Sequence, residues 1–295
     1  MGKEHCLLTT KTIYKGVVAR QGVSLKNGYL KRIIVQKNSE KVAVVLAACN
    51  GGRHLRMQLE SILRQTRLPD IILVADDVSD DDTLNIIEDF SNSTRIVLYI
   101  KNEKRIGHVR NFEMLLSKVL DYDYVFLSDQ DDFWYENKID RMLDVLRMSG
   151  GLVFSNADIV DENGGGVSET WFERIASHGG AERAYGLGCT TALSSRLLRA
   201  ALPIPKGSGH DVWLHFVAAN LGCRYKIDES LMHYRIHSSG TSKSKAKQKP
   251  IDGFKYLKMR GGVYKIARNI PLVLYHVRRL SGLARAYVIY KFIRR

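Results

Sequence analysis

Apolar and polar positions alternate in a regular way between residues 41 and 148. Continuous apolar, β-branched runs are typical of strands that are covered on both faces. Between them lie segments in which apolar residues recur at helical spacing. The runs occupy 41–50, 69–77, 95–102 and 122–132, and the amphipathic segments follow each of them. The pattern predicts an α/β fold with a mostly parallel central sheet flanked by helices.

Each predicted strand of this first part ends in polar or acidic residues. In open α/β sheets, ligands bind beyond the carboxyl ends of the strands, so we expect these side chains to converge on one site. They are Asn50, Asp76, Asp77, Asn102, Asp129 and Asp131.

The pattern changes after residue 150. Residues 151–167 predict a hairpin with a glycine-rich turn, and 186–205 predict a strand leading into a helix that stops at Pro203. Residues 209–222 predict another helix, and 223–242 a closing strand and loop. We therefore expect an appendage at 1–40, a main domain at 41–242 and a basic, helical extension at 243–295.

Charge is distributed unevenly. The 295 residues carry a net charge of +14, but 41–240 contain 22 basic and 28 acidic residues, whereas 241–295 contain 15 basic and 1 acidic residue. This argues against a basic nucleic-acid-binding core and for peripheral contact with an anionic surface. The absence of an apolar leader or long apolar run, with four scattered cysteines, predicts a cytoplasmic protein.

The strongest local signal is the acidic stretch "SDQDD" at the end of the fourth strand. Asp129 and Asp131 lie two residues apart and would face one side of an extended segment. Such a pair suits a magnesium or manganese ion that also takes phosphate oxygens. The alternative is a surface turn. For Asp132 we expect a capping role in the following turn, with possible reach toward an acceptor.

Three further sets of residues are candidates for the functional site. Asp76 and Asp77 would accept hydrogen bonds from a base or ribose, although helix capping is the alternative. Asp211, preceded by His210, suits a general base for an acceptor hydroxyl, or else a helix cap. His237 is either a structural histidine or, beside metal carboxylates, a ligand.

Several segments together resemble the family 2 glycosyltransferases, within them the bacterial rhamnosyltransferase-like branch. They cover about residues 41–242 and occur in the family's order. They are "VAVVLAACNGGRHLRMQLESILRQT", "ILVADDVSDDDT", "KNEKRIGHVRNFEMLL", "FLSDQDDFWYENKI", "GCTTALSSRLL", "HDVWL" and "YRIHSSGTS". The resemblance implies a GT-A fold that binds a nucleotide-diphospho-sugar and transfers its sugar with inversion.

The resemblance also assigns roles. Residues 41–132 would bind the nucleotide-sugar and 133–242 the acceptor. Asp129 and Asp131 match the family's metal-binding D-x-D, His237 matches a histidine near the metal or diphosphate, and Asp211 matches the catalytic base. The expected donor-side residues are Ala48, Cys49, Asn50, Asp76, Asp77, Arg105, Asn111 and Asp129, and the acceptor-side residues are Asp132, Trp134, His210 and Trp213.

Three departures from the family pattern affect these roles. Ala48 and Cys49 stand where the family usually has Thr and Tyr, which puts aromatic stacking on the base in doubt. Val78 replaces a usual glycine, and His210 replaces a glutamate, as is common in the rhamnosyl-like branch.

Aromatic and apolar residues are interleaved with the basic ones in 243–295. This mixture suits docking on an anionic bilayer, whereas a solvated extension packed on the domain is the alternative. Membrane docking would make the protein peripheral on the inner face of the cell membrane and a lipid-linked glycan its natural acceptor.

We therefore predict an inverting glycosyltransferase that uses Mn²⁺ or Mg²⁺ in bacterial surface polysaccharide synthesis. Its donor is a nucleotide-diphospho-sugar, with dTDP-rhamnose and UDP-hexoses as candidates. The alternatives are a sugar-phosphate nucleotidyltransferase and a non-enzymatic nucleic-acid- or polysaccharide-binding protein. A nucleotidyltransferase normally has a basic glycine-rich phosphate loop, and "AACNGGRHLRMQ" is only a partial match.

Overall fold

The computed structural model describes residues 40–180 and 186–236, in which the first part alternates strand and helix as predicted. Its elements are β1 (Val42–Ala48), α2 (Leu55–Leu63), β2 (Ile71–Asp76), α3 (Thr83–Ser93), β3 (Val97–Lys101), α4 (His108–Lys118), β4 (Tyr124–Ser128), β5 (Phe133–Trp134) and α5 (Lys138–Ser149).

The second part begins with the predicted hairpin and ends in a long strand. Its elements are β6 (Leu152–Val160), β7 (Gly166–Thr170), α6 (Trp171–Ser177), β8 (Thr191–Ser194), α7 (Ser195–Ala201), α8 (His210–Asn220) and β9 (Arg224–Arg235). Strand β5 and helix α6 were not predicted. Helix α6 starts at a capping box, in which the Thr170 hydroxyl and the Glu173 side chain satisfy each other's backbone N–H groups.

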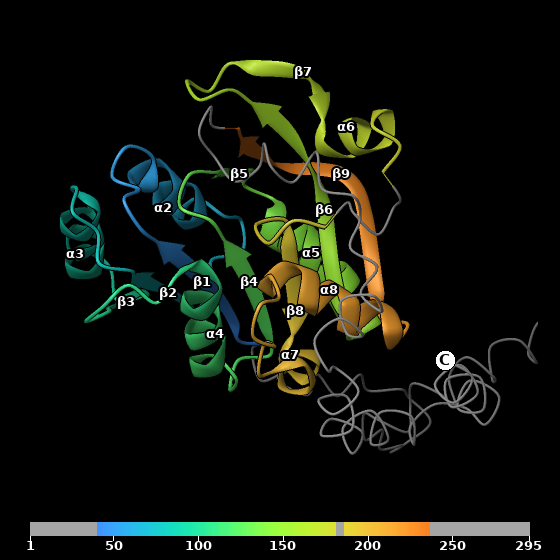
Figure 1. Cartoon of the computed structure of the whole chain (residues 1–295), viewed down its shortest axis with the longest axis horizontal. Coiled ribbons are helices and arrows are strands. Elements are labelled where there is room, and N and C mark those ends of the chain that lie inside the picture. Colours follow the sequence, from blue (N-terminus) through green and yellow to red (C-terminus); the bar gives the residue numbers. More distant parts are fainter. Residues whose placement is uncertain (1–39, 181–185, 237–295) are drawn as a thin grey trace, which may run out of the picture. The chain divides into compact units, whose positions relative to one another are not determined.

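The strands of the described residues form one sheet in the order β3-β2-β1-β4-β8-β6-β9-β5, with β7 paired to β6 (Figure 1). The four strands from β3 to β4 are parallel, so their carboxyl ends lie at one edge. Strand β8 runs antiparallel to both neighbours. The predicted α/β fold with flanking helices is confirmed, and its second half is a mixed sheet.

Burial explains the sequence pattern. Every residue of β1 is buried, because α4 packs against β1 and β2 while neighbouring strands cover its edges. Helix α5 buries a face that includes Ile139, Met142 and Leu146, and it ends at Gly150 in the left-handed conformation that glycine favours.

The short strand β5 corrects one prediction. Asp132 caps no helix, because β5 follows it directly and α5 begins only at Lys138, after Asn137. Its side chain is instead buried, and its Oδ1 accepts a 3.5 Å hydrogen bond from the Arg235 backbone N–H of β9.

Some predictions lie outside the described residues: the appendage before residue 40, His237 and the extension 243–295. Among the helices of the part that the structure describes, none combines the length and apolar character needed to cross a membrane.

Candidate active site

Gln130 joins the loops that follow β1 and β4. Its Nε2 donates to the Cys49 carbonyl oxygen at 3.0 Å, and its Oε1 accepts from the Cys49 N–H at 2.8 Å. A methyl group at Gly51 would lie 2.3 Å from this Oε1, so the contact requires glycine there. Two strand ends far apart in the sequence are thereby held together.

Asp77 organises the loop after β3. Its Oδ1 accepts from Asn102 Nδ2 at 2.9 Å and from the Ile106 N–H at 2.8 Å, while its Oδ2 accepts from the Gly107 N–H at 2.8 Å. Burial by itself would raise the pKa of Asp77, but these hydrogen bonds outweigh it and lower the pKa. Asp77 is therefore an ionised anchor for the loop that leads into α4.

Asn111 continues this network beneath the loop. It is buried, its Nδ2 donates to the Ala75 carbonyl at 2.9 Å, and its Oδ1 accepts from Asn102 at 3.1 Å. The structure thus places Asn111 under the predicted donor site. Ala48 lies at the same level, because its carbonyl accepts from the Asp77 N–H at 2.8 Å.

The other predicted donor-side residues gather around the 78–80 turn. Asp76 is buried and accepts from the Ser79 hydroxyl and, at 3.1 Å, from the Ser79 N–H. Asn50 Oδ1 accepts from the Asp80 N–H at 3.0 Å, and Arg105 donates to the Val78 carbonyl at 3.2 and 3.3 Å. The side chains predicted from three strand ends therefore do converge.

Asp129, Asp132 and Cys189 form a cluster at the end of β4. One ligand atom from each lies within 4.8 Å of the others. Asp131 is not in this cluster, and its carbonyl accepts a 3.0 Å hydrogen bond from Arg235 Nε. The structure thus brings the first acid of the predicted pair together with Asp132 and a cysteine that lies 57 positions further along the chain.

Lys138 places a buried ammonium beside this cluster. Its Nζ donates to the Cys189 carbonyl at 2.7 Å and lies 4.0 Å from the centre of the Trp134 ring. Burial lowers the pKa of Lys138 to about 8, although Cys189, Asp132 and Asp129 oppose that shift. Trp134, only 1% exposed, has no surface to present to an acceptor in this conformation.

The cluster fits a divalent cation on chemical grounds. Burial, and then the charges of Asp131 and Asp129, raise the pKa of Asp132 well above its usual range. Its Oδ2 is buried and has no nitrogen donor within the part of the chain that the structure describes, although the Cys189 thiol lies beside the carboxylate and hydrogen-bonds to it. A cation would relieve this repulsion, and paired carboxylates suit Mg²⁺ or Mn²⁺.

A series of ring contacts connects Asp129 to the start of α8. His108 Nε2 lies 3.9 Å from Asp129 Oδ1, and the His108 ring meets the His210 ring edge-on at 5.0 Å. His210 in turn stacks on Phe112 at 4.1 Å. A methyl group at Gly188 would lie 2.7 Å from His210 Nε2, so this close approach excludes larger residues.

Asp211 follows His210 in the first turn of α8. It is buried, and its Oδ1 accepts a 2.8 Å hydrogen bond from the Val212 N–H. The contacts of His210 therefore bring this carboxylate to the same end of the sheet as Asp129. It lies in the first turn of α8, where the helix dipole favours negative charge, and a carboxylate is one of the side chains that can act as a general base.

His215, one turn further along α8, fixes the 187–191 segment. Arg224 Nε donates to His215 Nδ1 at 2.8 Å, so Nε2 carries the ring proton and faces Thr191 Oγ1 at 2.8 Å. Thr191 donates onward to the Leu187 carbonyl at 2.6 Å. Burial, and then the Arg224 charge, lower the pKa of His215 to about 3, so the ring is neutral.

Trp213, predicted to lie on the acceptor side, helps to anchor α8. Its Nε1 donates to the Ala201 carbonyl at 2.6 Å, and its ring stacks on Phe216.

Sequence reasoning missed Gln130, His108, Lys138 and His215. For Lys138 a signal was available, because the apolar spacing of α5 places it on the buried face, where a lysine needs partners. The part of the other three in the site is evident only from contacts between segments that are distant in the sequence.

Several known proteins are similar to this chain in sequence. A dTDP-rhamnosyl transferase, RfbG, from Shigella flexneri is 38% identical over 122 residues, a match that spans 40% of each chain. A β-1,3-glucosyltransferase of Escherichia coli, WfaP, whose name gives UDP-Glc and α-D-GlcNAc-diphosphoundecaprenol, is 25% identical over 71% of this chain and 82% of its own.

Among solved structures, Staphylococcus aureus TarS in complex with UDP-GlcNAc has a TM-score of 0.55 and 18% identity. It covers 86% of this chain and 71% of its own, and the likeness shows a shared fold. Residues 43–193, half of the chain, match the sequence model of Glycosyl transferase family 2. This chain belongs to the glycosyl transferase family 2.

Proposed function

We propose that the chain is an inverting, metal-dependent glycosyltransferase. It takes a sugar from a nucleotide-diphospho-sugar and transfers it to a hydroxyl of a glycan or lipid-linked acceptor. The observation that carries the proposal is the placement of the Asp129–Asp132–Cys189 cluster and the start of α8 at one site, joined through His108 and His210.

The roles of the protein groups follow from this placement. The Asp211 carboxylate removes the proton from the acceptor hydroxyl, whose oxygen attacks the anomeric carbon of the donor sugar. The bond to the nucleoside diphosphate breaks as the new bond forms. One displacement inverts the configuration and needs no enzyme nucleophile.

Asp129 and Asp132 would hold the cation, with Asp131 and His237 as further predicted ligands. When bound, Mg²⁺ or Mn²⁺ supplies positive charge to the diphosphate leaving group. Asn50, Cys49, Asp76, Asp77 and Arg105 surround the expected place of the nucleoside.

The relatives' names narrow the donor and acceptor. RfbG supports dTDP-rhamnose as donor, whereas WfaP supports UDP-glucose and a sugar linked to a lipid diphosphate. We infer an acceptor on the inner face of the bacterial membrane, in surface polysaccharide synthesis, with docking through 243–295.

The test is donor turnover with Mn²⁺. The purified full chain is incubated with dTDP-rhamnose, UDP-glucose and UDP-GlcNAc separately, and released nucleoside diphosphate is quantified. Slow release from one donor supports the proposal. A second incubation contains a nucleoside triphosphate and a sugar phosphate. Release of pyrophosphate there would indicate a nucleotidyltransferase, and no turnover in either incubation would favour a binding protein.

A further inference from the structure

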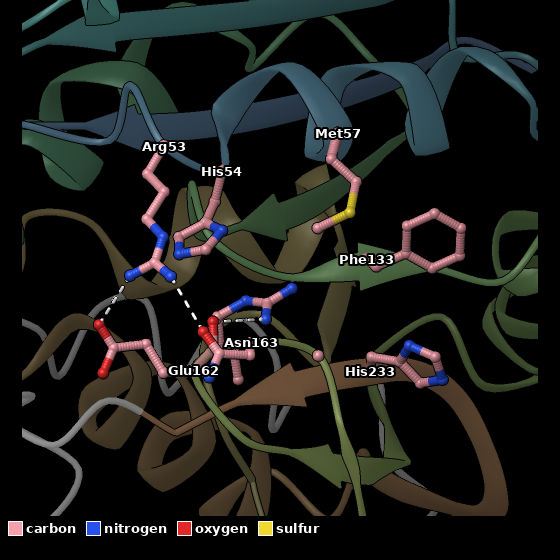
Figure 2. Close-up of a pocket in the computed structure, with 9 residues that line it drawn as sticks. Arg53, His54, Met57, Phe133, Glu162, Asn163 and His233 are labelled. Atoms are coloured by element: carbon pink, nitrogen blue, oxygen red, sulfur yellow. Dashed lines mark hydrogen bonds and ion pairs between the residues drawn. The ribbon is translucent and has the colours of Figure 1, made fainter.

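A cavity of about 450 Å³ lies beside the candidate active site, and its lining residues take no part in the proposed transfer step. It opens between the start of α2, strand β5, the tip of the β6–β7 hairpin and strand β9 (Figure 2). Its volume is in the range of small-molecule sites, roughly 300–1,000 Å³.

One wall of the cavity is polar and already ordered. Arg53 Nη1 donates to Glu162 Oε1 at 2.9 Å, and Arg53 Nη2 donates to Asn163 Oδ1 at 3.1 Å (Figure 2). This wall offers guanidinium donors, a carboxylate acceptor and an amide that does both. Because Glu162 offsets the charge of Arg53, this pair suits a neutral ligand whose hydroxyl groups both donate and accept.

The opposite wall is mainly aromatic. The rings of Phe133 and His233 lie 5.7 Å apart at a tilt of 33°, and Met57 lines the same side. Figure 2 shows these side chains on the other side of the cavity from Arg53 and Glu162. A sugar ring has a polar rim and a C–H face, so an aromatic wall opposite a hydrogen-bonding wall complements it.

Arg235 connects the cavity to the acidic loop of the active site. Its buried guanidinium donates through Nε to the Asp131 carbonyl at 3.0 Å and through Nη1 to the Asp161 and Glu162 carbonyls, both at 3.1 Å. The loop that carries Asp129 and the hairpin that forms the polar wall are thus held by one side chain.

We propose that this cavity binds a neutral sugar unit of the acceptor glycan, at a distance from the unit that receives the transferred sugar. The inference rests on the proposed glycosyltransferase function. It assigns to Arg53, Glu162, Asn163, Phe133 and His233 a part in choosing the acceptor.

The test is binding of the full chain to an array of bacterial surface oligosaccharides, followed by titration with the best binder. Glu162→Ala removes the carboxylate, a hydrogen-bond acceptor, from the exposed hairpin tip. Phe133→Leu removes the aromatic ring but keeps an apolar side chain, so that the protein still folds. Asp89→Ala is the matched control, because Asp89 also pairs with an arginine of α2, Arg56, through exposed side chains outside the cavity.

We expect the wild type and Asp89→Ala to bind equally and both cavity variants to bind about fivefold more weakly or worse. Equal binding by the cavity variants would overturn the inference. The inference would also be overturned if the wild type bound no oligosaccharide of the array, or if it bound inorganic pyrophosphate and none of the oligosaccharides. Nucleoside diphosphate release by the wild type, measured in parallel, separates this failure from failure of the proposed function.

Discussion

The side-chain amide of Gln130 pairs with both backbone groups of Cys49, at 2.8 and 3.0 Å. This pair sets the distance between the predicted nucleoside side of the site, after β1, and the acidic loop after β4. A donor whose base lies on the nucleoside side and whose diphosphate lies at the acidic loop must span this distance.

Gln130→Ala should therefore weaken donor binding and cost about 1–2 kcal/mol of folding free energy, the usual effect of losing partly buried hydrogen bonds. Urea unfolding measures the second effect and calorimetric titration of the donor the first. Asn85→Ala, which loses one exposed side-chain contact to Asp82, is the control. Unchanged donor affinity in Gln130→Ala would contradict the role of this pair.

Asp211→Asn should lower the rate of sugar transfer by about 100-fold or more, because general base catalysis typically contributes a factor of that size. Donor binding in the presence of Mn²⁺ should stay close to that of the wild type. Rates of glycan product formation and calorimetry measure the two effects. A variant that transfers sugar at near the wild-type rate would remove Asp211 from the base role.

Asp132→Asn should make the protein less responsive to Mn²⁺. The folded-state pKa of Asp132 is raised, so its ionisation costs stability as pH rises above the unfolded pKa, and a bound cation offsets that cost. With a chelator at neutral pH, the variant should be at least as stable as the wild type.

The measurement is the melting temperature with Mn²⁺ and with chelator. We expect a rise of roughly 5–10 °C for the wild type at about 100 times the dissociation constant, and a smaller one for Asp132→Asn. Asp228→Asn alters an exposed carboxylate of β9 and serves as control. An identical rise in all three proteins would place the cation elsewhere.

His215 should make the fold sensitive to acid. Its pKa is about 3 in the folded protein and near 6.5 in an unfolded chain, so its contribution to stability is present above pH 6.5 and is lost as the pH falls toward 3. His215→Gln should flatten the dependence of unfolding free energy on pH over this window, whereas the exposed His178→Gln should not. The same slope in both variants would refute this.

Deletion of 243–295 should abolish co-sedimentation with vesicles that contain anionic phospholipid. The segment carries 15 basic residues, each contributing about 1 kcal/mol when it lies close to such a surface. Binding of the full chain should fall as salt is raised, since the attraction is screened. Full activity together with unchanged sedimentation after the deletion would count against membrane docking.

Local pattern predicted much of the fold, because strand and helix periods are properties of neighbouring residues. The four parallel strands, their helices and the β6–β7 hairpin all occur where the pattern placed them. Strand β5 escaped prediction because two residues carry no period, and it forms only where β9 supplies its partner.

The sequence by itself determined that acids would gather beyond the parallel strands. The apolar runs end in Asp77 and Asp129, and the carboxyl ends of parallel strands lie at the same edge of the sheet. Only the tertiary structure decided which acid joins which partner. Asp132 meets Cys189, and Arg53 meets Glu162, because strands β8 and β6 return beside the first four. Contacts between such distant segments depend on chain topology, and a local pattern carries no information about it.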